Sequence, residues 1–138
     1  MTSKELRIAG AMLYVGEGTK LRKDPRYKNT FIYAIELTNS DPQIVALFIK
    51  FLKEELEVDF SKVRGQLFIY PDLNREKVMR VWSRKTGIPI AQFQKVIMLK
   101  PRSLVFRHSP LGTFKVRMSS KEKFLKLQSI IESVWKSV

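Results

Sequence analysis

The sequence predicts a domain of the α+β class, with helices on one face of an antiparallel, curved sheet. Two patterns predict this class. Residues 31–38 and 113–118 alternate apolar and polar side chains, as half-buried strands do, whereas residues 44–52 and 124–135 repeat apolar side chains at helical spacing. The segments follow in the order helix, two strands, helix, strand, an inserted helix, further strands and a last helix. This order suits antiparallel strands that are covered on one side.

The bulk composition is that of a globular chain. It has 138 residues, 44% apolar and 28% charged, and no linker or low-complexity segment, so we expect a single domain over residues 1–138. The absence of cysteine excludes disulfides and thiolate metal sites. No apolar run approaches the roughly 18 residues of a membrane span, and no signal peptide is visible, so a cytoplasmic location is expected.

The first half of the chain should begin with a helix over residues 4–15 that stops at Gly16. A basic segment over residues 19–30 follows, with a turn at Asp24-Pro25 between strands. Residues 30–39 alternate and predict the next strand. Ser40 and Gln43 have capping-box spacing, which predicts the start of the second helix.

The second half should contain the remaining strands and two further helices. Residues 62–70 predict a strand, and residues 74–87 predict an inserted helix stopped by its closing glycine. We expect strand-like segments at 94–100 and 103–108 and a clearer strand at 112–118. Ser119 and Glu122 repeat the capping-box spacing, which predicts a helix from there to the C-terminus.

Charge is the strongest indication of a partner. The 26 Lys and Arg residues exceed the 13 acids, which gives a formal net charge of +13 and a pI near 10.2. Between Lys77 and Lys121 there is no Asp or Glu. Such a surplus attracts polyphosphates by Coulomb force and by counterion release. A solvated basic face without a partner is the plain alternative, and a membrane surface is disfavoured because no helix combines a basic face with an exposed apolar one.

Part of this charge should lie on the uncovered face of the sheet. A twisted ribbon that carries Arg, Lys and Gln side chains has the width and the donors to enter the major groove of double-stranded DNA. The residues that we expect to contact DNA are Lys20, Arg22, Lys23, Arg64, Gln66, Lys115 and Arg117. Basic residues on strands can also be ordinary solvent-facing side chains that bind no partner.

Three segments resemble the LAGLIDADG homing endonuclease family. They are "LRIAGAMLYVGEGTK", "IELTNSDPQIVALFIKFLKEE" and "GTFKVRMSSKEKFLKL", and the similarity covers most of the chain. The inserted "NREKVMRVWSRKTGIPIAQFQK" resembles a segment of small prokaryotic relatives. The resemblance implies that the first helix pairs with a second copy about a two-fold axis. It also implies that the acid before the closing glycine, Glu17, binds a catalytic divalent metal, Mg²⁺.

The resemblance has consequences for assembly and chemistry. With one motif per chain, the second carboxylate would come from another subunit, so a homodimer is implied. Lys20 and Lys136 are candidates for the lysine that the family places near the attacked phosphate. Val15 stands where the family usually has a second acid, and Met12 where it commonly has glycine. The helix surface expected at the dimer interface comprises Ala9, Gly10, Ala11, Leu13 and Gly16.

Three functions follow as hypotheses. The first is a Mg²⁺-dependent DNA endonuclease, and the second is a DNA-binding regulator that does not cleave. The third is an RNA-binding, splicing-assisting relative, since aromatic side chains on strands can stack on bases. Other chemistry lacks its motifs: the sole histidine, His108, cannot form a multi-histidine metal site, and "GEGTK" lacks the spacing of a phosphate-binding loop.

Overall fold

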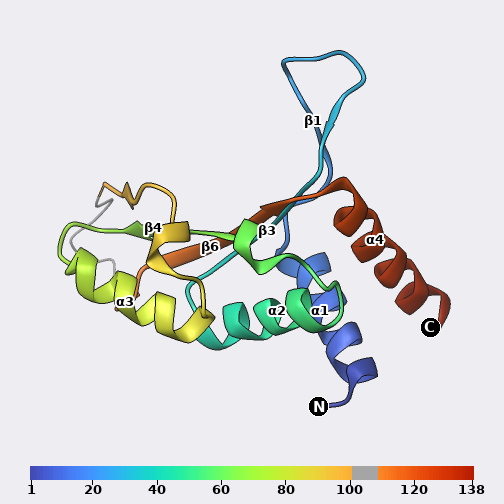
Figure 1. Ribbon diagram of the computed structural model, residues 1–138, viewed down its shortest axis with the longest axis horizontal. Coiled ribbons are helices and arrows are strands. Elements are labelled where there is room, and N and C mark those ends of the chain that lie inside the picture. The colour runs from blue at the N-terminus through green and yellow to red at the C-terminus, as the bar shows by residue number, and fades with distance from the viewer. Residues whose placement is uncertain (101–108) are drawn as a thin grey trace.

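Four α-helices and a four-stranded sheet make up most of the protein (Figure 1). The structure is a computed structural model that describes residues 1–100 and 109–138. The expected α+β class is confirmed. The predicted strand at 103–108 and His108 lie outside the described residues. The helices are α1 (Ser3–Glu17), α2 (Pro42–Glu54), α3 (Arg75–Thr86) and α4 (Lys121–Lys136), with short 3-10 turns η1 (Phe60–Lys62) and η2 (Ile90–Gln92).

The main sheet has the strand order β3-β6-β4-β5. Its strands are β3 (Ala34–Asn39), β4 (Arg64–Ile69), β5 (Ile97–Met98) and β6 (Thr113–Ser119). The long strand β6 lies between β3 and β4 and is antiparallel to both. The pairing of β5 with β4 is parallel, so the expectation of a wholly antiparallel sheet is wrong at this edge. The reason is the connection: β4, α3 and β5 form a crossover through a helix, and such a crossover returns the chain in the same direction.

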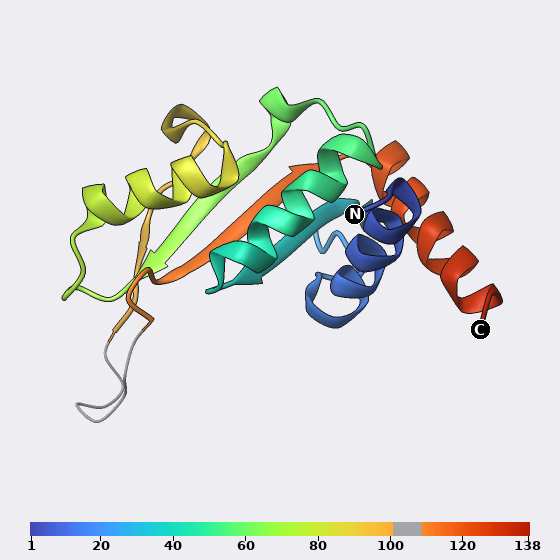
Figure 2. The same cartoon turned by 90° about the horizontal axis from the view of Figure 1, so that it is seen from below.

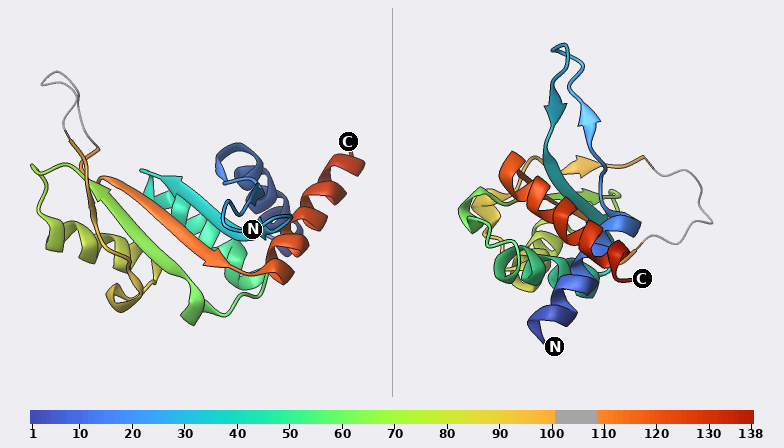
Figure 3. Two further views of the ribbon diagram at one scale, coloured as in Figure 1. Left: turned by 90° about the horizontal axis from the view of Figure 1, so that it is seen from above. Right: turned by 90° about the vertical axis from the view of Figure 1, so that its right-hand side faces the viewer.

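The helices α2 and α3 cover one face of the sheet and leave the other uncovered. Figure 2 shows both helices in front of the strands, and the left view of Figure 3 shows the strands in front of both helices. Inward-facing side chains of β6 and β4 meet the helices in the core, where Trp82 of α3 stacks on Phe114 with ring centroids 4.8 Å apart. Trp82 also donates its Nε1–H to the carbonyl oxygen of Leu111 at 2.7 Å.

The first and last helices lie together at the β3 end of the sheet (Figure 1). Helix α1 starts with a capping box between Thr2 and Glu5 that the sequence analysis overlooked, and it runs to Glu17, beyond the expected end at residue 15. The side chain of Tyr33 meets Phe124 of α4 edge-on, with centroids 5.8 Å apart. No helix within residues 1–100 and 109–138 has the length and apolarity that a membrane span requires.

Two predicted helix starts are wrong by one residue. Asp41, and not Ser40, is the N-cap of α2, where its carboxylate accepts the backbone N–H of Gln43 at 2.9 Å. Ser120, and not Ser119, is the N-cap of α4. Ser119 is still the last residue of β6, paired with Ala34. In both cases two adjacent residues are good N-caps. Pro42 favours the first helical position, which makes Asp41 the cap of α2, and Ser119 is paired in β6, which leaves Ser120 as the cap of α4.

A two-stranded hairpin projects from the molecule on the uncovered side of the sheet (Figures 1 and 3). It is formed by β1 (Arg22–Lys23) and β2 (Phe31–Ile32). An antiparallel bridge between Gly18 and Leu37 joins the base of the hairpin to β3. The turn expected at Asp24-Pro25 is therefore the start of a longer hairpin tip.

The contact between α1 and α2 yields a test of the packing. A Cβ added at Gly10 would lie 2.1 Å from the ring of Phe51, which is fully buried. Overpacking typically destabilises by about 1–3 kcal/mol, more than the gain of about 0.5–1 kcal/mol from replacing a helical glycine with alanine. We expect Gly10→Ala to lower the free energy of unfolding in a urea titration. Gly16→Ala is the control, because its Cβ would meet nothing within 4 Å, and it should leave dilute protein as stable or slightly more so.

Candidate nucleic-acid interface

Two cross-strand rows of polar side chains occupy the uncovered face of the sheet. The strand register aligns Glu36, Arg117 and Arg64 in one row, and Thr38, Lys115 and Gln66 in the next. The neighbouring residues of β6, Phe114, Val116 and Met118, point into the core. Four of the residues expected to contact DNA, Arg64, Gln66, Lys115 and Arg117, therefore lie side by side on the adjacent strands β4 and β6.

The side chain of Glu36 lies at the centre of these cations and is only 6% exposed. Its Oε1 accepts a hydrogen bond from Arg22 Nη2 at 2.8 Å and lies 3.6 Å from Arg117 Nη1. Its Oε2 lies 3.7 Å from Lys115 Nζ. The alternation of residues 31–38 indicates the face on which Glu36 lies, but not its partners. Its ion pairs with Lys115 and Arg117 depend on the register with β6, and its pair with Arg22 depends on the hairpin.

The hairpin extends the basic surface away from the sheet. Lys20 and Arg22 lie along its first arm, with Lys23 exposed in β1. At its tip the carboxylate of Asp24 accepts a hydrogen bond from the backbone N–H of Arg26 at 2.9 Å. It accepts two more from the guanidinium of the same residue, from Nε at 3.1 Å and from Nη2 at 2.9 Å. These hydrogen bonds hold the pKa of Asp24 below its usual range. In the first arm, the side chain of Arg22 points toward the sheet, where it contacts Glu36, and Lys23 is exposed to solvent.

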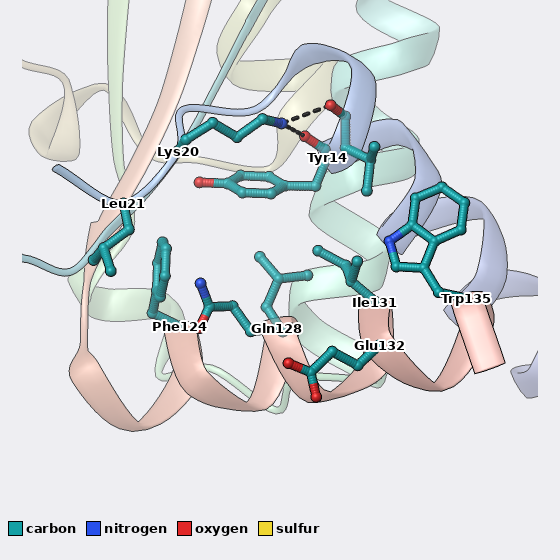
Figure 4. A pocket seen from close by; sticks show the side chains of 10 residues that line it. Tyr14, Lys20, Leu21, Phe124, Gln128, Ile131, Glu132 and Trp135 are labelled. Carbon is teal, nitrogen blue, oxygen red and sulfur yellow. Dashed lines mark hydrogen bonds between the residues drawn. The ribbon is translucent and has the colours of Figure 1, made fainter.

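Glu17 is exposed at the C-terminal end of α1, next to the exposed Gly16. Lys20 lies close to the same end, but its amine is engaged: Nζ donates to the carbonyl oxygens of Tyr14 at 3.0 Å and Val15 at 2.6 Å (Figure 4). Lys20 thus caps the helix, where a cation is favourable. The other lysine candidate, Lys136, is exposed in the last turn of α4.

A groove of about 460 Å³ separates the C-terminal half of α1 from α4. Val15 and Lys20 line one side of it, and Ile131, Glu132 and Trp135 line the other (Figure 4). Trp135 is 54% exposed and Ile8, on α1, is 41% exposed. The groove thus combines apolar side chains, among them the exposed Trp135, with the polar side chains of Lys20 and Glu132.

The residues expected at a dimer interface separate into two groups. Gly10 and Ala11 are buried within the chain, so they offer no surface to a second copy, and we remove them from that set. A small residue in this helix can face a second copy or the chain's own core, and at Gly10 it faces the core, where Phe51 of α2 packs against it. Ala9 and Leu13 are partly exposed, and Gly16 is exposed.

Tyr14 connects α1 to the sheet beneath the basic face. Its hydroxyl donates to the carbonyl oxygen of Thr19, and it lies 3.4 Å from the backbone nitrogen of Glu36. The ring stacks on Phe48 of α2 with centroids 5.7 Å apart. Burial raises the pKa of Tyr14 to about 12, because the phenolate would lose its hydration.

The raised pKa of Tyr14 predicts a loss of stability at alkaline pH. The unfolded chain releases this proton near pH 10, whereas the folded chain holds it to about pH 12, so stability is unaffected below pH 10 and falls between these values. We expect the wild-type free energy of unfolding to fall about 2 kcal/mol more than that of Tyr14→Phe from about pH 9 to pH 12. Urea titrations across this range test it, and parallel curves for the two proteins would contradict it.

A scan of protein-family models finds no match, and a search of curated proteins finds none either. Any function assigned to the chain therefore depends on the side chains and surfaces of the protein itself.

Proposed function

We propose that the protein binds double-stranded DNA through the uncovered face of its sheet. The observation that carries this proposal is the pair of cross-strand rows, in which Arg64, Arg117, Lys115 and Gln66 lie together on the face of the sheet opposite α2 and α3. Arg and Lys pair with guanine edges, and Gln pairs with adenine edges, so these side chains have the chemistry of base recognition in a major groove.

The distribution of charge supports the same proposal. Basic residues lie on the sheet face, at Arg64, Lys115 and Arg117, and on the hairpin, at Arg22, Lys23 and Arg26, within a chain of net charge +13. The hairpin projects on this side of the sheet (Figure 3). The helical layer also has exposed cations, on α3, and it has acids at the C-terminal end of α2, where Glu54, Glu55 and Glu57 line a hollow with Ser3 and Arg7. The sheet side therefore offers a polyanion cations on two neighbouring elements, the strands and the hairpin.

The fold adds support for a resemblance to LAGLIDADG proteins. Through the Gly18–Leu37 bridge, the first arm of the hairpin lies beside β3, which lies beside β6 and then β4. The chain thus runs α1, β1, β2, β3, α2, β4, β6 and α4, with α3, η2 and β5 between β4 and β6. A homodimer would form through the exposed part of α1, and it would place two basic sheet faces along one duplex.

Substitution of Arg117 tests DNA binding directly. We expect Arg117→Gln to weaken binding to a sequence selected from a random duplex library by about 1–3 kcal/mol, roughly tenfold to a hundredfold, because it removes a bidentate donor. Lys50→Gln, an equal change of charge on the exposed side of α2, should have little effect. Fluorescence anisotropy at fixed salt measures both affinities.

Equal losses in the two variants would show that only total charge matters, and the sheet-face proposal would fail. Wild-type protein that prefers structured RNA to any duplex would favour the splicing-assisting alternative instead.

DNA cleavage is a second candidate, and it depends on Glu17. The carboxylate is exposed at a helix C-terminus, where backbone carbonyls make the surroundings negative. One chain offers a single carboxylate there, and the described residues contain no group of three acids or histidines that could hold a metal ion. Mg²⁺ therefore fits only if a second copy contributes its own Glu17, and it would then supply an activated water and charge stabilisation at phosphate.

Replacement of Glu17 separates the nuclease from a regulator that only binds. We expect Glu17→Gln to abolish Mg²⁺-dependent cutting of a selected duplex, with a loss of at least about 100-fold in rate, while its DNA affinity stays within threefold of wild type, because the amide cannot replace a metal-binding carboxylate. Gel analysis of cut strands with and without Mg²⁺ measures the rate. Binding by wild-type protein without cutting in any divalent metal would favour the regulator.

A further inference from the structure

Glu36 is an unusual residue for a surface proposed to bind a polyanion. It is an acid at the centre of a basic face, and its side chain is 6% exposed. A carboxylate on such a face repels phosphate, and its burial costs hydration free energy unless cations compensate for it. Three cations from two elements do so: Arg22 from the hairpin, and Lys115 and Arg117 from β6.

The three cations differ from Glu36 in their exposure. The side chains of Arg22, Arg117 and Lys115 are 46%, 32% and 20% exposed. Each therefore has one side against the carboxylate and another side open to solvent. A guanidinium has five N–H donors in a rigid plane, so a group that engages one edge fixes the direction of the remaining donors. Glu36 thus holds Arg22 in a set orientation before any ligand arrives, through the hydrogen bond of 2.8 Å from its Nη2, and it attracts Arg117 and Lys115 by charge at 3.6 and 3.7 Å.

Pre-oriented arginines suit base recognition better than phosphate binding. A base edge requires a bidentate donor in one plane, whereas phosphates accept a flexible cation from many directions. Fixing the side chain in advance also lowers the conformational entropy lost on binding. At the same time the negative charge of Glu36 weakens the attraction of its three partners for the phosphates of any sequence.

We propose that Glu36 is a positioning residue for sequence discrimination: it orients Arg22 toward base edges and suppresses the binding of Arg22, Arg117 and Lys115 to phosphates. Glu36 is too buried to contact a base itself and acts through these cations. This inference rests on the proposed function of DNA binding. It goes further by assigning selectivity to an acid that, by charge alone, would only weaken binding.

The chain offers a matched control in Glu55. Its side chain is also largely buried, at 7% exposure, and it pairs with Arg7 Nε at 3.1 Å and with Ser3. It lies in the helical layer and not on the sheet face. Glu36→Gln and Glu55→Gln therefore make the same change of net charge and both remove a buried carboxylate, but only the first releases cations of the sheet face.

The experiment measures affinity for a selected duplex and for random duplex at several salt concentrations. In Glu36→Gln we expect random-duplex binding to strengthen, with a log–log salt slope steeper by about 1, as for one more phosphate contact. The ratio of selected to random affinity should fall at least about tenfold. Glu55→Gln should change neither the slope nor the ratio. Thermal melting identifies any loss of folding.

A second variant keeps the test decisive if Glu36→Gln does not fold. Glu36→Asp retains the charge but shortens the side chain by one methylene, so the selectivity ratio should fall while the salt slope stays unchanged. If folded variants keep the wild-type ratio, or if Glu55→Gln loses as much selectivity, the role of Glu36 is overturned while DNA binding stands. If the wild-type protein binds no duplex, the proposed function itself fails, and the inference fails with it.

Discussion

The two-residue period of β6 defines both faces of the sheet at once. One set of its side chains, Phe114, Val116 and Met118, is buried against the helices, and the intervening Lys115 and Arg117 must then point to the opposite side. Because β6 pairs with β3 and β4 on its two edges, their register is tied to the same alternation. A slip of one residue would bury two cations and expose three apolar side chains. Burial of the apolar side chains of β6 in the core therefore keeps the two cross-strand rows on the uncovered face.

The helices contribute by covering one face only. The rings of Trp82 and Phe114 stack within the core, and Phe51 packs directly against Gly10, which brings α1 close to α2. Tyr14 and Lys20 then connect the end of α1 to the segment that enters the hairpin. These contacts attach the start of the hairpin to α1, and the hairpin projects from there on the uncovered side of the sheet. Glu17 is located by the same contacts, at the end of the helix opposite its cap at Thr2.

Much of this arrangement could be predicted from the sequence, because strong local patterns determine it. The alternation in 112–118 and the apolar stripe of α2 indicate both the element and the face that is buried. The stripe of α4 indicates a helix, but only Phe124 and Leu127 at its start are buried, and Trp135 near its end is 54% exposed. The parallel strand β5 could not be predicted in this way, since its ladder covers two residues and depends on the crossover through α3. The ion pairs of Glu36 and the burial of Gly10 likewise depend on tertiary contacts between distant segments.

Lysine footprinting with and without duplex DNA tests most directly whether the uncovered sheet face is the contact surface. Acetylation followed by mass spectrometry reports the reactivity of each amine. If the uncovered face binds DNA, Lys23 on the hairpin and Lys115 on the sheet should lose most of their reactivity when duplex is bound, while Lys50 on α2 and Lys85 on α3 should keep theirs. Protection of the two helical lysines, with Lys23 and Lys115 unchanged, would contradict it.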